Sequence, residues 1–218
     1  MKKHVGVCLL AGSVVFLAGQ LVQANGMTAV PASRVAWHLV GRTLLDPATG
    51  RGQVLGYFTY IEGIPGPMFA GAPGESTAFF TLRSEPFSVQ TFPNGDIVIG
   101  LLSPGTFRLY LDTTPDQDFV NPESFSDGQT LATLNRLPAQ LSFVGPVFVD
   151  KFSTQILSAR NFIWQDQKLN ISRLTPNGVT LSVTGSTAFL PSGVIDFPVS
   201  ASFGASGVAI ERGRKEER

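Results

Sequence analysis

Alternation of apolar and polar residues dominates the middle of this chain and predicts β-strands. The clearest run is 107–112, Phe-Arg-Leu-Tyr-Leu-Asp, in which every second side chain is apolar up to the final aspartate. This period of two is typical of a strand that buries one face. A second apolar run covers 97–102, and a Pro/Gly turn precedes each of the two. We therefore predict that the stretch from Phe92 to Asp112 forms a β-hairpin around which the fold is organised.

Most of the remaining chain repeats the order of short strand, Gly/Pro turn and short strand. Further strands are expected at 35–40, 54–61, 76–83, 85–92, 141–148, 152–164, 169–174, 179–183 and 195–203. The pattern is interrupted at 113–135, where Asn121 and Pro122 resemble a helix start. Because Gly128 would soon end such a helix, at most one short helical turn is expected near 121–127. The prediction is an all-β fold, a single antiparallel β-barrel or β-sandwich of roughly ten strands over residues 32–208.

Three turns share one chemical pattern, a proline followed by Asn or Ser and then by glycine. They are Pro93-Asn94-Gly95, Pro176-Asn177-Gly178 and Pro191-Ser192-Gly193. Proline fixes φ at the first corner, and glycine accepts the positive φ at which the chain rejoins the ladder. The pattern predicts positive φ at all three glycines.

The first 24 residues predict a cleaved signal peptide. Lys2 and Lys3 precede an apolar run at 5–19, and Val22-Gln23-Ala24 offers a cleavage site. Cleavage would remove Cys8, the one cysteine, and would leave a cysteine-free domain without disulfides. Since extracellular eukaryotic domains commonly carry disulfides, this favours a bacterial periplasmic or secreted protein. Residues 25–31 are expected to form a flexible lead-in, and the charged segment 209–218 a disordered tail.

Charge and residue inventory exclude several functions. The 16 Lys and Arg residues balance 16 Asp and Glu residues and form no basic run, so nucleic acid is not an expected partner. No membrane span is expected after signal cleavage, because apolar pairs such as Leu101-Leu102 suit a soluble core better than a barrel embedded in lipid. His38 would be the single histidine of the processed chain, and its apolar neighbours predict a core or half-buried position. The inventory therefore argues against an enzyme that depends on histidine or cysteine.

The loop that follows Asp112 is the best candidate for binding a cation. Hard cations such as calcium prefer several converging oxygen ligands. Either the loop is simply solvated, or Asp112, Asp116, Asp118 and Glu123 form a calcium site. An EF-hand is excluded, because the sixth position counted from Asp112 is Gln117 and not glycine. Asp96, Asp112, Asp116 and Glu123 could instead supply the acidic pair of a glycosidase.

An apolar loop at 63–74 is the best candidate for contacting a ligand or partner. It carries Ile64, Met68 and Phe69, no charge, and three prolines that exclude helix and central strand. Either it folds back onto the sheet, or it forms a lid that touches an apolar ligand or partner. Aromatic residues in strands are usually part of the core, but Trp164, which ends a predicted strand beside Gln165 and Asp166, is the best candidate for an exposed aromatic platform.

The sequence favours an exported, non-enzymatic β-domain with a binding or structural role in the cell envelope or outside the cell. The partner would be a protein, a glycan or an apolar small molecule. Two alternatives stay open: a secreted polysaccharide hydrolase that depends on carboxylates, and a small barrel that binds an apolar ligand.

Overall fold

The computed structural model describes residues 27–211. The predicted signal peptide and most of the predicted tail lie outside these residues. The described elements are β1 (Val35–Asp46), β2 (Arg51–Ile61), η1 (Glu75–Thr77), β3 (Phe80–Ser84), β4 (Phe87–Asn94), β5 (Ile97–Leu102), β6 (Gly105–Leu111), η2 (Pro122–Phe125), β7 (Gln129–Arg136), β8 (Ala139–Val144), β9 (Val147–Ala159), β10 (Phe162–Trp164), β11 (Gln167–Leu169), α1 (Ile171–Leu174), β12 (Val179–Ser186), β13 (Leu190–Val194) and β14 (Phe197–Ala209).

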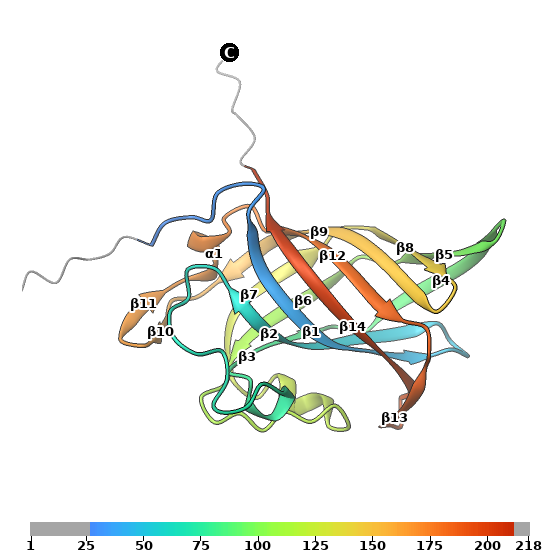
Figure 1. Ribbon diagram of the computed structural model, residues 1–218, viewed down its shortest axis with the longest axis horizontal. Coiled ribbons are helices and arrows are strands. Elements are labelled where there is room, and N and C mark those ends of the chain that lie inside the picture. Colours follow the sequence, from blue (N-terminus) through green and yellow to red (C-terminus); the bar gives the residue numbers. More distant parts are fainter. Residues whose placement is uncertain (1–26, 212–218) are drawn as a thin grey trace, which may run out of the picture.

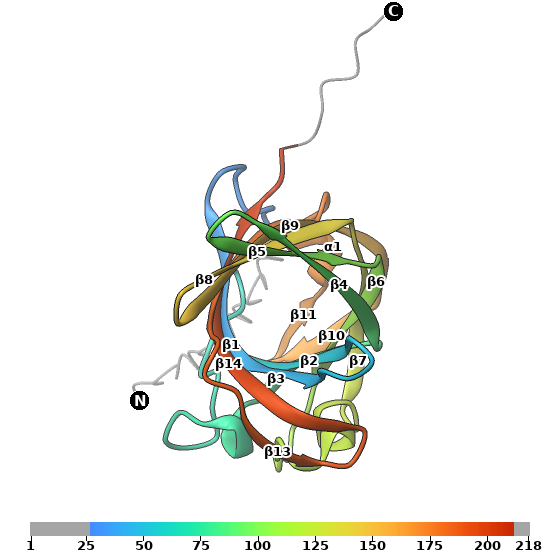
Figure 2. The ribbon, with the colours of Figure 1, turned by 90° about the vertical axis from the view of Figure 1, so that its right-hand side faces the viewer.

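Eight antiparallel strands close into a barrel, as the alternation predicted. Neighbours follow the order β1, β14, β12, β9, β7, β6, β3 and β2, and the pairing of β2 with β1 completes the ring. Figure 1 shows the barrel from the side, and Figure 2 shows it along its axis. The prediction of an all-β barrel or sandwich is confirmed, and the structure decides for the barrel.

Three adjacent barrel strands are each bent at a proline and continue beyond it. Two residues separate β3 from β4, β5 from β6 and β7 from β8, and in each case the second is a proline: Pro86, Pro104 and Pro138. On the far side of this row, β4, β5 and β8 repeat the neighbour relations of β3, β6 and β7. Because proline cannot donate to the ladder, the sheet is interrupted there without ending. We call this row the proline bend.

The predicted hairpin from Phe92 to Asp112 is therefore wrong in its second half. β5 pairs with β4 and β8, whereas β6 pairs with β3 and β7, so the two runs are successive parts of one bent strand. Ser103-Pro104 bends this strand and does not reverse the chain. A true turn joins β4 to β5, where Gly95 has the predicted positive φ of 66°.

The other two predicted turns also have their glycines at positive φ, whereas a predicted strand is corrected. Gly178 and Gly193 have φ values of 81° and 79°. A Cβ atom at Gly178 would lie 2.1 Å from the carbonyl oxygen of Thr154, so only glycine fits there. The predicted strand 169–174 is wrong beyond Leu169, which ends β11. Residues Ile171–Leu174 form the short helix α1, because the Asn170 side chain accepts a hydrogen bond from the backbone N–H of Ser172 and caps the helix.

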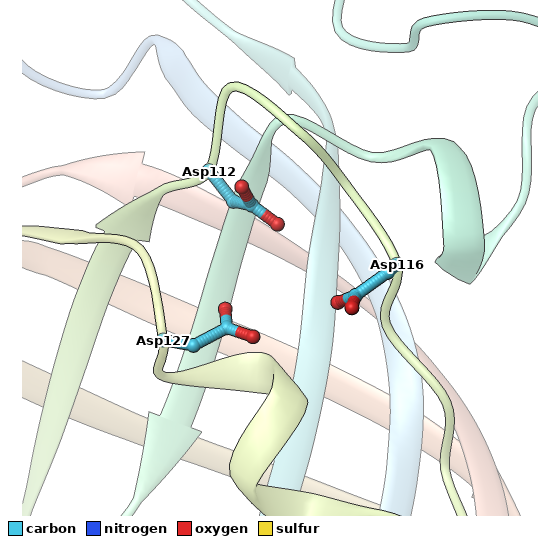
Figure 3. Close-up of side chains that lie close together, drawn as sticks. All are labelled: Asp112, Asp116 and Asp127. Atoms are coloured by element: carbon cyan, nitrogen blue, oxygen red, sulfur yellow. The ribbon is translucent and has the colours of Figure 1, made fainter.

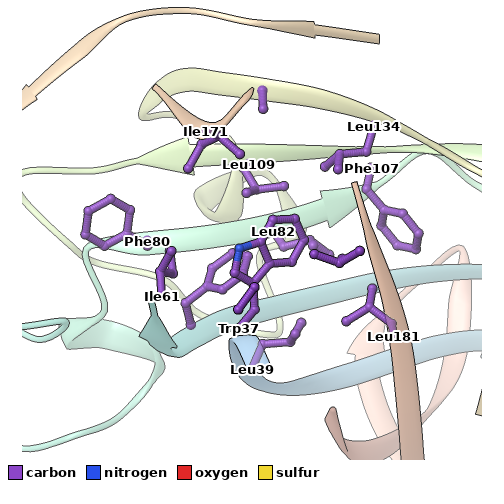
Figure 4. Packing of buried hydrophobic residues seen from close by; sticks show 14 of the residues in the cluster. Trp37, Leu39, Ile61, Phe80, Leu82, Phe107, Leu109, Leu134, Ile171 and Leu181 are labelled. Atoms are coloured by element: carbon purple, nitrogen blue, oxygen red, sulfur yellow. The ribbon is translucent and has the colours of Figure 1, made fainter. Parts of the chain in front are cut away.

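One half of the barrel interior is solid. The β10–β11 hairpin and α1 connect β9 to β12 and lie across the far end in Figure 2. Side chains from these elements and from the strands interlock there, including Trp37, Phe80, Leu109 and Ile171 (Figure 4). Within this half, Phe58 and Phe80 are 0% and 1% exposed. Such dense packing of apolar side chains supplies the main stabilisation of the fold.

A second, smaller apolar cluster lies outside the barrel. Residues 112–128 fold back over β1 and β2, so that Phe119 and Phe125 pack on Leu44 and Leu55. Phe197 of β14 completes the cluster. The predicted helical turn lies in this excursion as the 3₁₀ turn η2. Among the described residues, none of the helices has the length and apolar character needed to cross a membrane.

Candidate functional site

The half of the barrel beyond the proline bend encloses a cavity of about 90 Å³. All eight positions around the barrel contribute to its lining, including β4 and β8 on the far side of the bend. Seven phenylalanine rings are part of this lining, and Arg136 and Asp150 are its only charged residues. We call this space the barrel cavity.

Side chains around the barrel cavity are packed less tightly than those in the closed half. Phe148, Phe152 and Phe203 each keep 8% of their surface accessible. Phe189, in the link between β12 and β13, lines the cavity and is also 42% exposed. The cavity therefore reaches the molecular surface beside Phe189, which gives a small molecule a route to the interior.

Arg136 ends β7 on the inside of the proline bend and is 2% exposed. Within the described chain it makes one hydrogen bond, from Nη2 to the carbonyl oxygen of Ser103. That carbonyl precedes Pro104, where the ladder is interrupted, so the guanidinium satisfies an acceptor that the bend leaves free. The guanidinium also lies 4.3 Å from the ring centre of Phe87 and 5.8 Å from that of Phe107. These cation–π contacts replace part of its lost hydration.

Most of the hydrogen-bonding capacity of Arg136 is unused. A guanidinium has five N–H donors, and its buried Nε–H has no partner among the described residues. A buried donor without a partner costs roughly 1–3 kcal/mol, and more when the group is charged. This unpartnered donor therefore costs stability unless something else in the cavity binds it.

Asp150 lies on β9 between Phe148 and Phe152 and points into the same cavity. It is 9% exposed, and its Oδ1 atom has no hydrogen-bond partner within the described part of the chain. Burial raises the pKa of this carboxyl from 3.8 to about 6, although the Arg136 charge and the Lys151 amide act in the opposite direction. Burial likewise lowers the pKa of Arg136 to about 10, against the opposing effect of Asp150.

Arg136 and Asp150 interact across the cavity without direct contact. Across residues 27–211, no hydrogen bond or ion pair joins them, although each influences the pKa of the other. Two buried charges that face one cavity with unsatisfied polar atoms are unusual, because native proteins pair such groups. Perturbed charged groups in a cavity are characteristic of functional sites. We call these two residues the buried charged pair.

Sequence reasoning missed the buried charged pair, although a signal for it exists. In the run 148–152, Phe-Val-Asp-Lys-Phe, the aspartate shares the apolar phase of the strand. Arg136 likewise follows Leu134 at a spacing of two. A charged residue in the apolar phase of a strand is the period-two mark of a buried charge. Arg136 ends a strand whose other residues fall within 113–135, where the β pattern is interrupted in the sequence and hides the strand.

The predicted cation ligands separate into two groups. Asp112 and Asp116 approach each other and are joined by Asp127, with carboxylate oxygens within 4.8 Å of one another (Figure 3). Asp118 instead accepts a hydrogen bond from the backbone N–H of Val120. Glu123 forms a two-pronged ion pair with Arg83, with distances of 2.5 and 2.6 Å. We call Asp112, Asp116 and Asp127 the aspartate cluster.

Hydrogen bonds already hold the buried member of the aspartate cluster. Oδ1 of Asp112 accepts from the N–H of Thr114 at 2.9 Å, and Oδ2 accepts from Nε2 of Gln117 at 2.7 Å. Burial raises the pKa of Asp127, and the negative charges of Asp112 and Asp116 raise it further. The cluster therefore carries mutual repulsion that a cation or a proton would relieve.

The apolar loop folds back onto the barrel, one of the two arrangements that the sequence allowed. Ile64 is buried at 8% exposure, and Met68 packs against the main core. Phe69 is partly buried and meets Tyr57 edge-on at a centroid distance of 6.0 Å. These three residues lie away from the lining of the barrel cavity.

The structure decides the position of Trp164 and corrects that of His38. Trp164 belongs to the core and is not an exposed platform: it is 8% exposed, packs on Phe79 and Phe80, and donates from Nε1 to the carbonyl oxygen of Pro65 at 2.7 Å. The β10–β11 hairpin folds inward and carries the tryptophan with it. His38, expected in or near the core, is exposed on the outside of β1, with Nδ1 2.9 Å from Oγ of Ser206.

Fold and site together define a closed antiparallel β-barrel with a charged, partly open internal cavity. Comparisons with protein-family models, with curated proteins and with solved structures found no significant match. The functional argument therefore depends on the residues of this chain.

Proposed function

We propose that this protein is an exported binding protein whose barrel takes up a small, largely apolar molecule. One observation carries the proposal: the barrel cavity is lined by apolar side chains yet contains a buried charged pair with unused hydrogen-bonding atoms. Apolar pockets with a few convergent polar groups are the usual form of small-molecule sites. Export is supported by the N-terminal pattern of Lys2 and Lys3 before an apolar run.

The energetics of the cavity also support a binding role. Burying an ion costs several kcal/mol, and apolar replacements of buried ion pairs are frequently more stable. Arg136 and Asp150 are thus poor choices for stabilising a barrel interior. Residues that cost stability are expected where function requires them.

A polysaccharide hydrolase that uses the acidic loop has less support. Hydrogen bonds from Thr114 and Gln117 occupy both oxygens of Asp112. Glu123 is likewise held by Arg83 in a two-pronged ion pair, so both carboxylates have structural roles in the loop.

Nuclear magnetic resonance of the processed protein with labelled methyl groups tests the binding proposal. On titration with hexan-1-ol, we expect shift changes at the cavity methyls of Leu141, Leu181 and Val183. Methyls of Leu131 and Leu174, in the closed half, should move little. An absence of saturable changes up to the solubility of the alcohol would contradict the proposal.

Two phenylalanine substitutions on neighbouring positions of β12 provide a matched control. Val183 lines the cavity, whereas Thr184 is exposed on the outer face. Val183→Phe should fill part of the cavity and weaken hexan-1-ol binding at least tenfold, whereas Thr184→Phe should leave it unchanged. Equal effects of both substitutions would show that the alcohol binds elsewhere.

A further inference from the structure

We infer that the molecule bound in the barrel cavity is a small monocarboxylate with an apolar body, held through its carboxylate by Arg136, and that Asp150 takes up one proton when it binds. This inference depends on the proposed function, and it adds the chemical class of the ligand and a regulation by pH.

The donors of Arg136 favour a carboxylate. A guanidinium presents its N–H groups in a planar fork that matches the two oxygens of a carboxylate. The bond from Nη2 to Ser103 and the two phenylalanine rings fix the guanidinium in place. Its buried Nε–H remains free. A carboxylate would satisfy this donor, while the surrounding apolar side chains would contact the rest of the ligand.

The charges in the cavity explain why binding of a carboxylate should take up one proton. Arg136 and ionised Asp150 together are neutral, so an added carboxylate would leave one uncompensated negative charge in an apolar interior. Such a charge is strongly disfavoured, and a carboxyl close to another carboxylate takes up a proton instead. With Asp150 protonated, the cavity contains one cation and one anion, and the protonated carboxyl can donate a hydrogen bond to the ligand.

Asp150 is suited to this role because its environment already favours the neutral form. Burial raises its pKa to about 6, so protonation at pH 7 reduces the affinity only about tenfold. The residues that face Asp150 across the cavity from β4, β8, β12 and β14 are apolar. Arg136 on β7 is the one other charged group among the described cavity residues. Lys151, its neighbour on β9, is exposed on the outer face of the strand.

The cavity limits the size of the ligand. A cavity of roughly 150 Å³ binds benzene, so the space of about 90 Å³ seen here must widen, by movement of the partly exposed rings, to admit a six-carbon chain or a single aromatic ring. Hexanoate and benzoate are therefore appropriate probes for an aliphatic and an aromatic ligand. Hexan-1-ol and benzyl alcohol are their neutral counterparts.

Isothermal titration calorimetry of the processed protein tests the inference. At pH 6, we expect at least one acid to bind at least tenfold more tightly than its alcohol. Proton uptake should weaken its binding about fivefold from pH 6 to 7 and about ninefold from pH 7 to 8, because Asp150, with a pKa of about 6, is already half protonated at pH 6. Titrations at one pH in phosphate and in Tris, which differ in ionisation enthalpy, should report that proton directly. The better of the two acids identifies the ligand as aliphatic or aromatic.

Three variants assign the effects to residues. Asp150→Asn should bind the acid at pH 8 at least tenfold more tightly than the unmodified protein, with little pH dependence. Arg136→Met should lose the preference for the acid while it retains alcohol binding. Lys151→Met, which removes a charge from the outer face next to Asp150, should change neither property.

The outcomes separate the inference from the proposed function. If the alcohols bind and neither acid is preferred, or if binding takes up no proton, the inference is overturned and the binding function stands. A pH dependence that persists in Asp150→Asn also overturns the inference. If neither acids nor alcohols bind, the proposed function itself is overturned.

Discussion

Replacement of Asp150 by asparagine should make this barrel more stable at neutral pH. The carboxyl has a pKa of about 6 in the folded protein, compared with an ordinary value of 3.8. As the pH rises, the unfolded chain loses its proton near pH 4, whereas the folded chain holds it to about pH 6. Ionisation therefore lowers the free energy of unfolding over this interval, by about 3 kcal/mol in total. Asparagine resembles the protonated carboxyl in size and polarity and does not ionise.

The expected difference between the two proteins depends on pH in a defined way. Well below pH 3.8, where Asp150 is protonated in both states, the unmodified protein and Asp150→Asn should have similar unfolding free energies. Between pH 4 and 6 the variant should become progressively more stable, and above about pH 6.5 its advantage should level off at up to about 3 kcal/mol. Urea unfolding monitored by tryptophan fluorescence at intervals from pH 4 to 8 measures this difference.

A control and a contrary result make this experiment decisive. Asp196→Asn removes an aspartate that is exposed in the β13–β14 turn, and such surface changes are usually within about 0.5 kcal/mol of neutral. If the stability difference for Asp150→Asn were independent of pH, or if the unmodified protein were the more stable at pH 7.5, the Asp150 carboxylate would be favourably solvated in the folded state. The argument that it is costly to bury would then be refuted.

Further predictions concern the buried charged pair, the aspartate cluster and the closed end of the barrel. Arg136→Met alone should destabilise the protein at pH 7.5, because it removes the positive charge that offsets the charge of Asp150. The double variant Arg136→Met/Asp150→Leu should recover this loss, or exceed the original stability by up to about 4 kcal/mol in urea unfolding. Losses of stability that add up in the double variant would contradict this. Asp127→Asn should raise the melting temperature at pH 7, because the raised pKa of Asp127 means that its ionised form costs stability above about pH 4. If the acidic loop binds calcium, as the sequence allows, calcium should raise the melting temperature of the unmodified protein and should raise that of Asp127→Asn by less. Equal melting temperatures of the unmodified protein with calcium and with EDTA would contradict calcium binding. Trp164→Phe should cost about 1–2 kcal/mol in urea unfolding, because it leaves the Pro65 carbonyl without its donor; no change would show that the indole N–H contributes nothing.

The alternation along the chain was sufficient to predict the fold class, because burial of one face is a local property of each strand. Turn chemistry was equally local, and the glycines of the three Pro-Asn/Ser-Gly turns have the predicted positive φ. The connection between strands is not local. Ser103-Pro104 and Pro93-Asn94-Gly95 look similar in sequence, yet the first bends a strand and the second reverses the chain. Which of these occurs depends on the partners that the flanking residues find across the sheet.

The exposure of aromatic residues and the presence of a cavity could not be predicted from the sequence pattern either. Trp164 has polar neighbours along the chain, but its hairpin folds across the barrel end and buries it against Phe79 and Phe80. Period two assigns Phe148 and Phe203 to the inner face, but it does not say whether their rings meet or leave space between them. That depends on how eight strands and their bends fill the interior together.

The departures from the period-two pattern carry more functional information in this protein than the pattern itself. Apolar inner positions follow from the need for a core, so they would be similar in a barrel of any function. Asp150 and Arg136 occupy inner positions against that need, and the fold compensates for them only in part: one carboxylate oxygen and one guanidinium N–H lack partners within the described residues. A barrel selected for stability alone would have replaced both with apolar residues at little cost or with a gain. Under the binding proposal, a molecule that enters the cavity would supply the missing partners.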